Sequence, residues 1–139
     1  ISNGPGNPKM CDATIRNLAK ALKQDIPVFG ICLGNQLIAL ASGADTYKLK
    51  YGHRSHNQPV LKAGTNSAFI TSQNHGFAID DSTLSEEWET YFINLNDGTN
   101  EGIRHKSRPV CSVQFHPEAS SGPTDTEYLF DDFLKLVRR

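Results

Sequence analysis

The sequence predicts an α/β protein with an open mixed sheet flanked by helices. Residues 12–22 and about 33–42 carry apolar side chains at helical spacing, and the apolar run between them, at 28–31, is typical of a buried strand that is compatible with parallel pairing. Short β segments follow, separated by Gly, Asn, Asp and Pro. This succession favours an α/β fold over an all-β fold.

The two predicted N-terminal helices have definable ends. Asp12 is a candidate cap for the first helix, in which Ile15, Leu18, Ala19 and Leu22 form the apolar side. The second helix is expected to end before Gly43, because glycine favours the left-handed C-terminal cap.

The rest of the chain is expected to supply more strands and one more helix. Candidate strands lie at about 46–49, 68–71, 90–94 and 110–115. The last helix is expected to begin at Thr124, because Glu127 three residues later completes a capping-box pattern. Its predicted apolar face comprises Leu129, Phe130, Phe133, Leu134 and Val137.

Composition excludes several classes of function. The 139 residues include 14 basic and 15 acidic side chains, a net charge of -1 that gives no footprint for nucleic acid or an anionic membrane. No apolar run approaches the roughly 20 residues of a membrane helix. The three widely spaced cysteines suit reduced thiols. We therefore expect a soluble cytoplasmic protein, with the mitochondrion as an alternative.

The segment 30–34, Gly-Ile-Cys-Leu-Gly, lies between the buried strand and the second helix. This is the thiol counterpart of the Gly-x-Ser-x-Gly nucleophile elbow, in which a sharp turn presents the nucleophile to substrate. Small Gly30 and Gly34 would let the backbone pass on both sides of Cys32. Cys32 is the candidate nucleophile, and the alternative is a buried structural cysteine, as we expect for Cys11 and Cys111.

The position of Cys32 before a helix predicts acyl-transfer chemistry. Unpaired N–H groups and the helix dipole favour a thiolate, and such thiols can titrate at about 3.5–7.5. The N–H of Leu33 would point toward a developing oxyanion.

Among the five histidines, His116 is the candidate base because it ends the strand at 110–115, and sites of α/β sheets gather at the carboxyl ends of strands. Glu118 would hold the imidazole, with Pro117 stiffening the turn between them. Taken alone, a His-Pro-Glu is more often a surface turn, and its weight here comes from pairing with Cys32.

We predict no metal site. His53 and His56 lie three residues apart, but no cysteine or acidic residue lies at ligand spacing nearby. His75 is followed by Gly76, which would permit close approach of a ligand to the backbone, and the alternative is a polar turn.

Three segments together resemble class I (triad) glutamine amidotransferases: Gly-Ile-Cys-Leu-Gly-Asn-Gln at 30–36, Ser-Gln-Asn-His-Gly-Phe at 72–77 and Ser-Val-Gln-Phe-His-Pro-Glu-Ala at 112–119. Further segments at 2–6, 52–54, 57–60, 96–99 and 122–123 resemble the glutaminase of carbamoyl-phosphate synthetases in particular. The resemblance covers nearly the whole chain. It implies a flavodoxin-like fold whose N-terminal strands would precede Ser2, so that residues 1–139 would form a partial glutamine amidotransferase domain.

The resemblance also assigns roles. It implies that Cys32, His116 and Glu118 form a catalytic triad that converts glutamine to glutamate and ammonia through a thioester. Gly4 and Leu33 would supply the oxyanion-hole N–H groups. The substrate glutamine would be held by Gln36, Asn74, Gly76 and Phe77. Gln36 has a local reason as well, because one helical turn after Cys32 places it on the same face as the sulfur.

The implied partner is a carbamoyl-phosphate synthetase, either as a separate large subunit or as fused domains, serving pyrimidine or arginine synthesis. The glutaminase itself would need no cofactor, while ATP and Mg²⁺ would act in the synthetase. Two other hypotheses stay open at this point. The chain is a non-catalytic regulatory module that docks on a synthetase, or it is another elbow-cysteine hydrolase, such as a peptidase or γ-glutamyl hydrolase.

Overall fold

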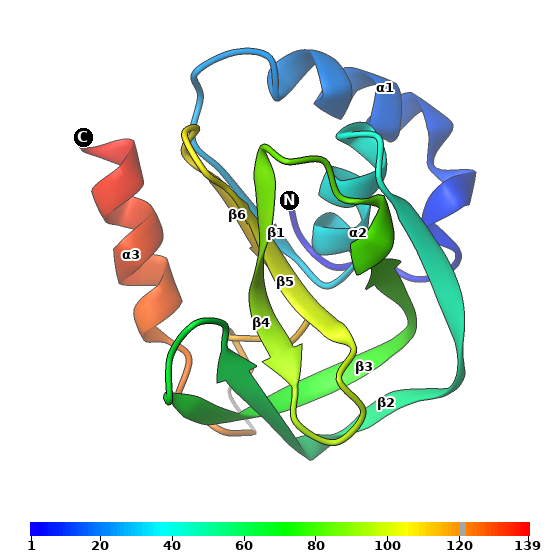
Figure 1. Cartoon of the computed structure of the whole chain (residues 1–139), viewed down its shortest axis with the longest axis vertical. Coiled ribbons are helices and arrows are strands. Elements are labelled where there is room, and N and C mark those ends of the chain that lie inside the picture. Colours follow the sequence, from blue (N-terminus) through cyan, green and yellow to red (C-terminus); the bar gives the residue numbers. More distant parts are fainter. Residues whose placement is uncertain (120–121) are drawn as a thin grey trace.

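The computed structural model describes residues 1–119 and 122–139 and has a six-stranded mixed sheet in the order β1-β6-β5-β4-β2-β3 (Figure 1). The helices are α1 (Asp12–Ala21), α2 (Leu33–Ala41) and α3 (Tyr128–Val137). The strands are β1 (Val28–Ile31), β2 (Asp45–Lys62), β3 (Ala68–Asp80), β4 (Trp88–Asn94), β5 (Asn100–His105) and β6 (Val110–Val113). β1 and β6 pair in parallel, and the other neighbours are antiparallel. The predicted α/β class and mixed sheet are confirmed.

Helices cover the two faces of the sheet, with α1 and α2 on one side of β1 and β6 and α3 on the other (Figure 1). The alternation of side chains along β1 produces this arrangement. Val28 packs with the core of α1 and α2, whereas Phe29 belongs to a second core that includes Leu129 of α3. The helices therefore bury both faces of the parallel strands β1 and β6, as expected for parallel strands.

The ends of α2 follow the sequence prediction. Its last turn closes with the N–H of Ser42 on the Ile38 carbonyl, and Gly43 takes a φ of +95°. Only glycine adopts this left-handed conformation at no steric cost, so the predicted C-terminal cap is confirmed.

The prediction for the last helix was wrong in two respects. α3 begins at Tyr128, because residues 124–127 form a turn in which the Glu127 N–H donates to the Thr124 carbonyl and no side chain caps the helix. Leu129 is buried, but Leu134 and Val137 are 44% and 53% exposed. The apolar side of α3 that packs on the sheet is therefore narrower than the sequence pattern predicted.

The antiparallel half of the sheet is larger than predicted. β2 and β3 extend far beyond 46–49 and 68–71, and they run across the lower end of the molecule in Figure 1. The middle of these added portions is polar, with His53 opposite His75 and Arg54 opposite Asn74. β5 was missed altogether, because Asn100 and Glu101 are polar yet almost fully buried. Apolar periodicity does not detect strands whose side chains line a polar site.

None of the helices in the described part of the chain has the length and hydropathy that a membrane crossing requires.

Candidate active site

Cys32 occupies the sharp turn between β1 and α2. Its φ of +54° is the only positive φ of a non-glycine residue in the described part of the chain. The backbone is pinned there, because the Cys32 N–H donates to the carbonyl of Val113, the last residue of β6, over 2.9 Å. A β-carbon in this region of φ is strained, and such strain is found where a surrounding structure imposes a functional conformation.

The glycines on both sides of Cys32 are required by close packing. A β-carbon at Gly30 would lie 2.6 Å from Cδ1 of Ile38 and 2.8 Å from the backbone of Gly34. A β-carbon at Gly34 would overlap the backbone of Ile1. Strand, turn and helix therefore approach one another more closely than any other residue type would permit, as the sequence predicted.

The Cys32 thiol is buried, at 3% exposure, and has two polar neighbours. Sγ donates toward the carbonyl of Asn74 over 3.8 Å and accepts from Nε2 of Gln114 at 3.6 Å. Burial raises the pKa of the thiol to about 11, and the Leu33 N–H and the Gln114 amide offset only part of this effect. The prediction of a thiol with a lowered pKa was wrong, because desolvation outweighs the helix N-terminus.

A network of buried amides holds Gln114 in place. Oε1 of Gln114 accepts from Nδ2 of Asn35 and from Nε2 of Gln36, each over 3.1 Å, and Ser112 Oγ donates to Oδ1 of Asn35 over 2.7 Å. Gln114 was not proposed from the sequence, because its position between Val113 and Phe115 suggested an ordinary strand residue. The available clue in the sequence was its position two residues before His116, the candidate base.

His116 and Glu118 form a second unit at the same edge of the sheet. Nδ1 of His116 lies 2.7 Å from Oε1 of Glu118, and the His116 N–H donates to the Ser72 carbonyl. Because Ile31 is paired with Val113, Cys32 and His116 both follow the carboxyl ends of neighbouring parallel strands. The charge of Glu118 contributes to the raised pKa of Cys32. Among the described residues, the Cys32 sulfur bonds to Asn74 and Gln114 and makes no hydrogen bond to His116.

A cavity of about 590 Å³ opens over Cys32, a size typical of small-molecule sites. Most of the site residues proposed from the sequence line it, namely Gly4, Cys32, Leu33, Gln36, Asn74, Gly76 and Phe77. His116 and Glu118 are not among the lining residues. The cavity is also lined by two cations that the sequence analysis did not propose, Lys48 and Arg54.

Gln36 lies in the wall with its amide group already engaged. Nε2 donates to the Phe77 carbonyl over 3.1 Å and to Gln114. Both amide hydrogens are therefore used, and the carbonyl oxygen of Gln36 is the atom left for a ligand.

His75 connects the cavity to a buried polar cluster. Its Nδ1 donates to the Phe77 carbonyl over 2.8 Å, and its Nε2 lies 3.1 Å from Nδ1 of His53. Burial lowers the pKa of His75 to about 4, whereas Glu101 and Asp97 raise the pKa of His53 to about 9. His53 therefore does have acidic neighbours, which the local sequence could not reveal because they lie on β5 and in the β4–β5 turn.

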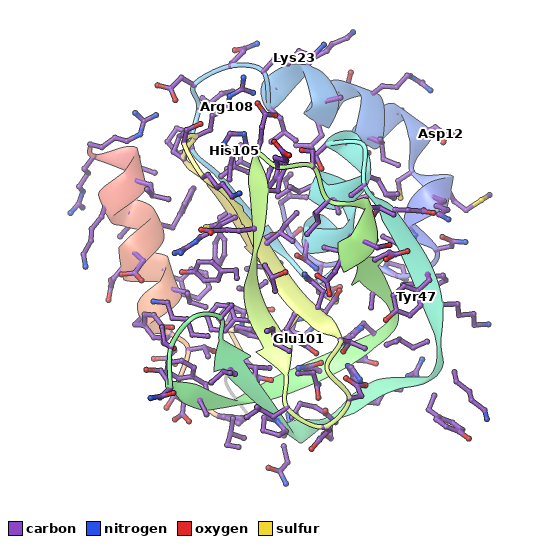
Figure 2. The ribbon with its side chains drawn as sticks, in the orientation of Figure 1. Asp12, Lys23, Tyr47, Glu101, His105 and Arg108 are labelled. Atoms are coloured by element: carbon purple, nitrogen blue, oxygen red, sulfur yellow. The ribbon has the colours of Figure 1, made fainter. Side chains whose placement is uncertain are left out.

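Two other histidines lie outside this cluster. His56 is exposed and bonds through Nδ1 to Ser72 Oγ. His105 lies at the opposite end of β5 from Glu101 (Figure 2). Cys11 and Cys111 are free thiols that pack against the two cores, in agreement with the structural role expected for them.

Comparisons with known proteins converge on one family. The model of the family "Glutamine amidotransferase class-I" matches residues 1–136. The chain is 57% identical to the carbamoyl phosphate synthase arginine-specific small chain of Debaryomyces hansenii, covering 100% of this chain and 33% of that protein. The small chain of the same name from Candida albicans is 60% identical over 99% of this chain and 32% of the relative. The chain thus spans about a third of the length of these curated relatives.

Solved structures show the same fold. A structure from Thermoplasma acidophilum, described as a GMP synthase protein, superposes with a TM-score of 0.80 at 26% identity, covering 99% of this chain and 70% of the other. A glutamine amidotransferase from Thermotoga maritima gives a TM-score of 0.72 at 21% identity, covering 98% of this chain and 61% of the other.

Proposed function

We propose that this chain, which belongs to the class I glutamine amidotransferase family, carries the catalytic centre that hydrolyses the side-chain amide of glutamine to glutamate and ammonia. One observation carries the proposal. The strained Cys32 faces a cavity of substrate size and follows the strand next to the one that leads to the His116–Glu118 pair. A nucleophile, a base and a group that orients the base are the minimum set for covalent acyl transfer.

His116 is proposed as the general base. With Nδ1 held by Glu118, the proton on that nitrogen is fixed, and Nε2 is left to accept the thiol proton. Because the pKa of Cys32 is raised, the proton would leave as the sulfur attacks the amide carbon, when substrate draws Sγ away from the Asn74 carbonyl. The imidazolium then returns this proton to the leaving nitrogen, which departs as ammonia and leaves a thioester.

Water completes the cycle in the proposed mechanism. His116 takes a proton from the water that attacks the thioester carbonyl, and the tetrahedral intermediate collapses to glutamate as the sulfur regains a proton. The N–H groups of Leu33 and Gly4 are proposed to stabilise the oxyanion in both steps. Leu33 is the first residue of α2 and Gly4 lines the cavity beside it, with the Leu33 side chain 2.8 Å from a β-carbon position at Gly4.

Substrate recognition is proposed to use the α-ammonium and α-carboxylate groups of glutamine. The free carbonyl oxygen of Gln36 would accept from the α-ammonium group. The neighbouring segment of Asn74, Gly76 and Phe77 lines the same cavity and offers backbone groups close to the ligand.

The partner is proposed to be the synthetase that consumes the ammonia. This proposal is supported by the relatives, which are named small chains of an arginine-specific carbamoyl phosphate synthase. ATP and Mg²⁺ would act in that synthetase, either a separate large subunit or fused domains.

The test uses the full-length protein with its synthetase. A chloroketone analogue of glutamine should alkylate Cys32, as located by peptide mass spectrometry, and Cys32→Ala should lose glutaminase activity by several orders of magnitude. Cys11→Ala is the matched control and should retain activity. Hydrolysis that survives Cys32→Ala would remove Cys32 from the mechanism, and an active synthetase complex without any glutamine hydrolysis would favour a docking module.

A further inference from the structure

We propose that His53, Gln73, His75 and Glu101 form a structural zinc site behind the catalytic cavity. The four side chains come from three strands, β2, β3 and β5, and converge although 48 residues separate the first from the last. All four are buried, with exposures of 7%, 2%, 7% and 0%. His53, His75 and Glu101 have their ligand atoms within 4.8 Å of one another.

The spacing of the inward atoms fits a small tetrahedral ion. Nδ1 of His53 lies 3.1 Å from Nε2 of His75, 3.1 Å from Oε1 of Gln73 and 3.3 Å from Oε1 of Glu101. Nε2 of His75 lies 2.8 Å from Oε1 of Gln73. Zinc bonds of about 2.0–2.1 Å place tetrahedral ligands about 3.3 Å apart, so a modest expansion of the cluster would admit the ion.

The inward atoms of the cluster include more hydrogen-bond acceptors than there are hydrogens to place between them. Nδ1 of His75 gives its hydrogen to the Phe77 carbonyl, so its Nε2 carries a lone pair. Nε2 of Gln73 donates to Thr71 Oγ1, which turns Oε1 of the amide inward. Two acceptors therefore face each other at 2.8 Å with no hydrogen between them. Oε2 of Glu101 is buried and has no hydrogen-bond partner among the described residues.

A divalent cation would satisfy these lone pairs together, whereas a single proton on His53 Nδ1 cannot lie between Gln73 and His75. An unpaired polar atom in the interior destabilises the folded protein, so the excess of acceptors favours a bound cation.

The groups around the cluster are those that orient zinc-binding histidines. Nε2 of His53 is held by Oδ2 of Asp97 over 2.6 Å, and Nδ1 of His75 is held by a main-chain carbonyl over 2.8 Å. Such outer contacts fix the tautomer that directs the other nitrogen at the metal. Imidazole and carboxylate ligands suit zinc, and four protein ligands leave no open position, which indicates a structural ion. It would hold β2, β3 and β5 behind the Asn74–Phe77 wall of the cavity.

The experiment measures zinc in the full-length protein purified with its synthetase. Metal analysis without chelators should give about one zinc per chain, and protein stripped with chelator should regain it on titration with Zn²⁺ alone. Glu101→Gln preserves the side-chain volume and should weaken Zn²⁺ binding by at least about tenfold. His56→Gln is the matched control, because this exposed β2 histidine lies outside the cluster and should leave zinc content unchanged.

Three outcomes would overturn the proposal. Stripped protein that takes up no zinc at micromolar concentrations would show that the cluster is held by protons alone. An unchanged affinity for Zn²⁺ in Glu101→Gln, or loss of zinc from Cys32→Ala, would place the ion elsewhere. Co²⁺ substitution gives a second readout, since a tetrahedral site produces intense visible ligand-field bands, whereas an adventitious octahedral site gives only weak ones.

Discussion

The side-chain amide of Gln114 lies 3.6 Å from the Cys32 sulfur and donates to it, while the other end of the same amide accepts from Asn35 and Gln36. The thiol is therefore positioned by a residue that directly follows β6 and is itself fixed by the first turn of α2. This arrangement ties the nucleophile to the strand that leads to His116.

Replacement of Gln114 by methionine should lower both the stability of the folded protein and the reactivity of the Cys32 thiol. Two buried amide donors, from Asn35 and Gln36, would lose their shared acceptor, at a cost of about 1–3 kcal/mol each. The sulfur would lose a donor that lowers its pKa. We expect a lower midpoint in urea unfolding and slower inactivation by the glutamine chloroketone. An unchanged rate of inactivation would show that this donor does not assist the thiol.

The raised pKa of Cys32 predicts a particular pattern of alkylation. Iodoacetamide should modify Cys32 slowly at pH 7, since the thiol holds its proton up to a pKa of about 11. The rate should rise with pH above about 9. Half-buried Cys11 should be labelled first, whereas the glutamine chloroketone should select Cys32 at neutral pH. Peptide mass spectrometry follows each site, and rapid labelling of Cys32 by iodoacetamide at pH 7 would contradict the raised pKa.

The same pKa shift affects stability in alkaline solution. The folded state binds the Cys32 proton more tightly than an unfolded thiol with a pKa of 9.0. This tighter proton binding stabilises the folded state in full below pH 9, and the stabilisation is lost as the pH approaches 11. Cys32→Ala should therefore unfold with a weaker pH dependence over this window than the parent protein. Parallel urea titrations at several pH values measure this difference, and identical slopes would contradict it.

Gly30→Ala should damage the elbow itself. The added methyl would meet Ile38 and the Gly34 backbone, and overpacking of this kind costs about 1–3 kcal/mol. We expect loss of glutaminase activity, because relief of the clash must move α2 away from β1. Gly64→Ala is the control, since it strains a φ of +75° in a turn with open space around it. It should lower stability while activity is retained, which separates a stability effect from a distorted site.

Glu118→Gln tests the unit formed with His116. The amide keeps an oxygen that can accept from Nδ1, but it removes the charge that stabilises the imidazolium. Because Glu118 is 45% exposed, water screens part of this effect, and we expect kcat to fall by about 10–100-fold with little change in KM. Glu127→Gln, a carboxylate in the same surface depression, should leave kcat unaltered. Equal losses in both variants would argue against a specific role for Glu118.

The sequence predicted those features of the site that depend on local geometry. Strand β1, helix α2 and the need for small residues at Gly30 and Gly34 all follow from one short segment. It did not predict β5, because the strand that carries Glu101 buries polar side chains that pair only with distant partners. The pKa of Cys32 was mispredicted for a related reason, since desolvation arises from the packed tertiary structure.

Arg54 is expected to contribute to substrate binding through its charge. It lines the cavity and is the β2 partner of Asn74 on β3, and its guanidinium donates from Nη1 to the Tyr51 carbonyl over 2.9 Å, which holds it in place. A glutamine in the cavity carries an α-carboxylate that this cation would attract. Arg54→Met keeps much of the apolar stem, so we expect KM for glutamine to rise about tenfold while kcat is retained.

The salt dependence of KM provides the further check on Arg54. An attraction between partly exposed charges is screened, so KM of the parent protein should rise with ionic strength more steeply than KM of Arg54→Met. Arg104→Met is the matched control, because this arginine is paired with Glu89 on the surface, outside the cavity lining. If Arg54→Met and Arg104→Met shift KM equally, the effect belongs to net charge and Arg54 has no direct part in holding the carboxylate.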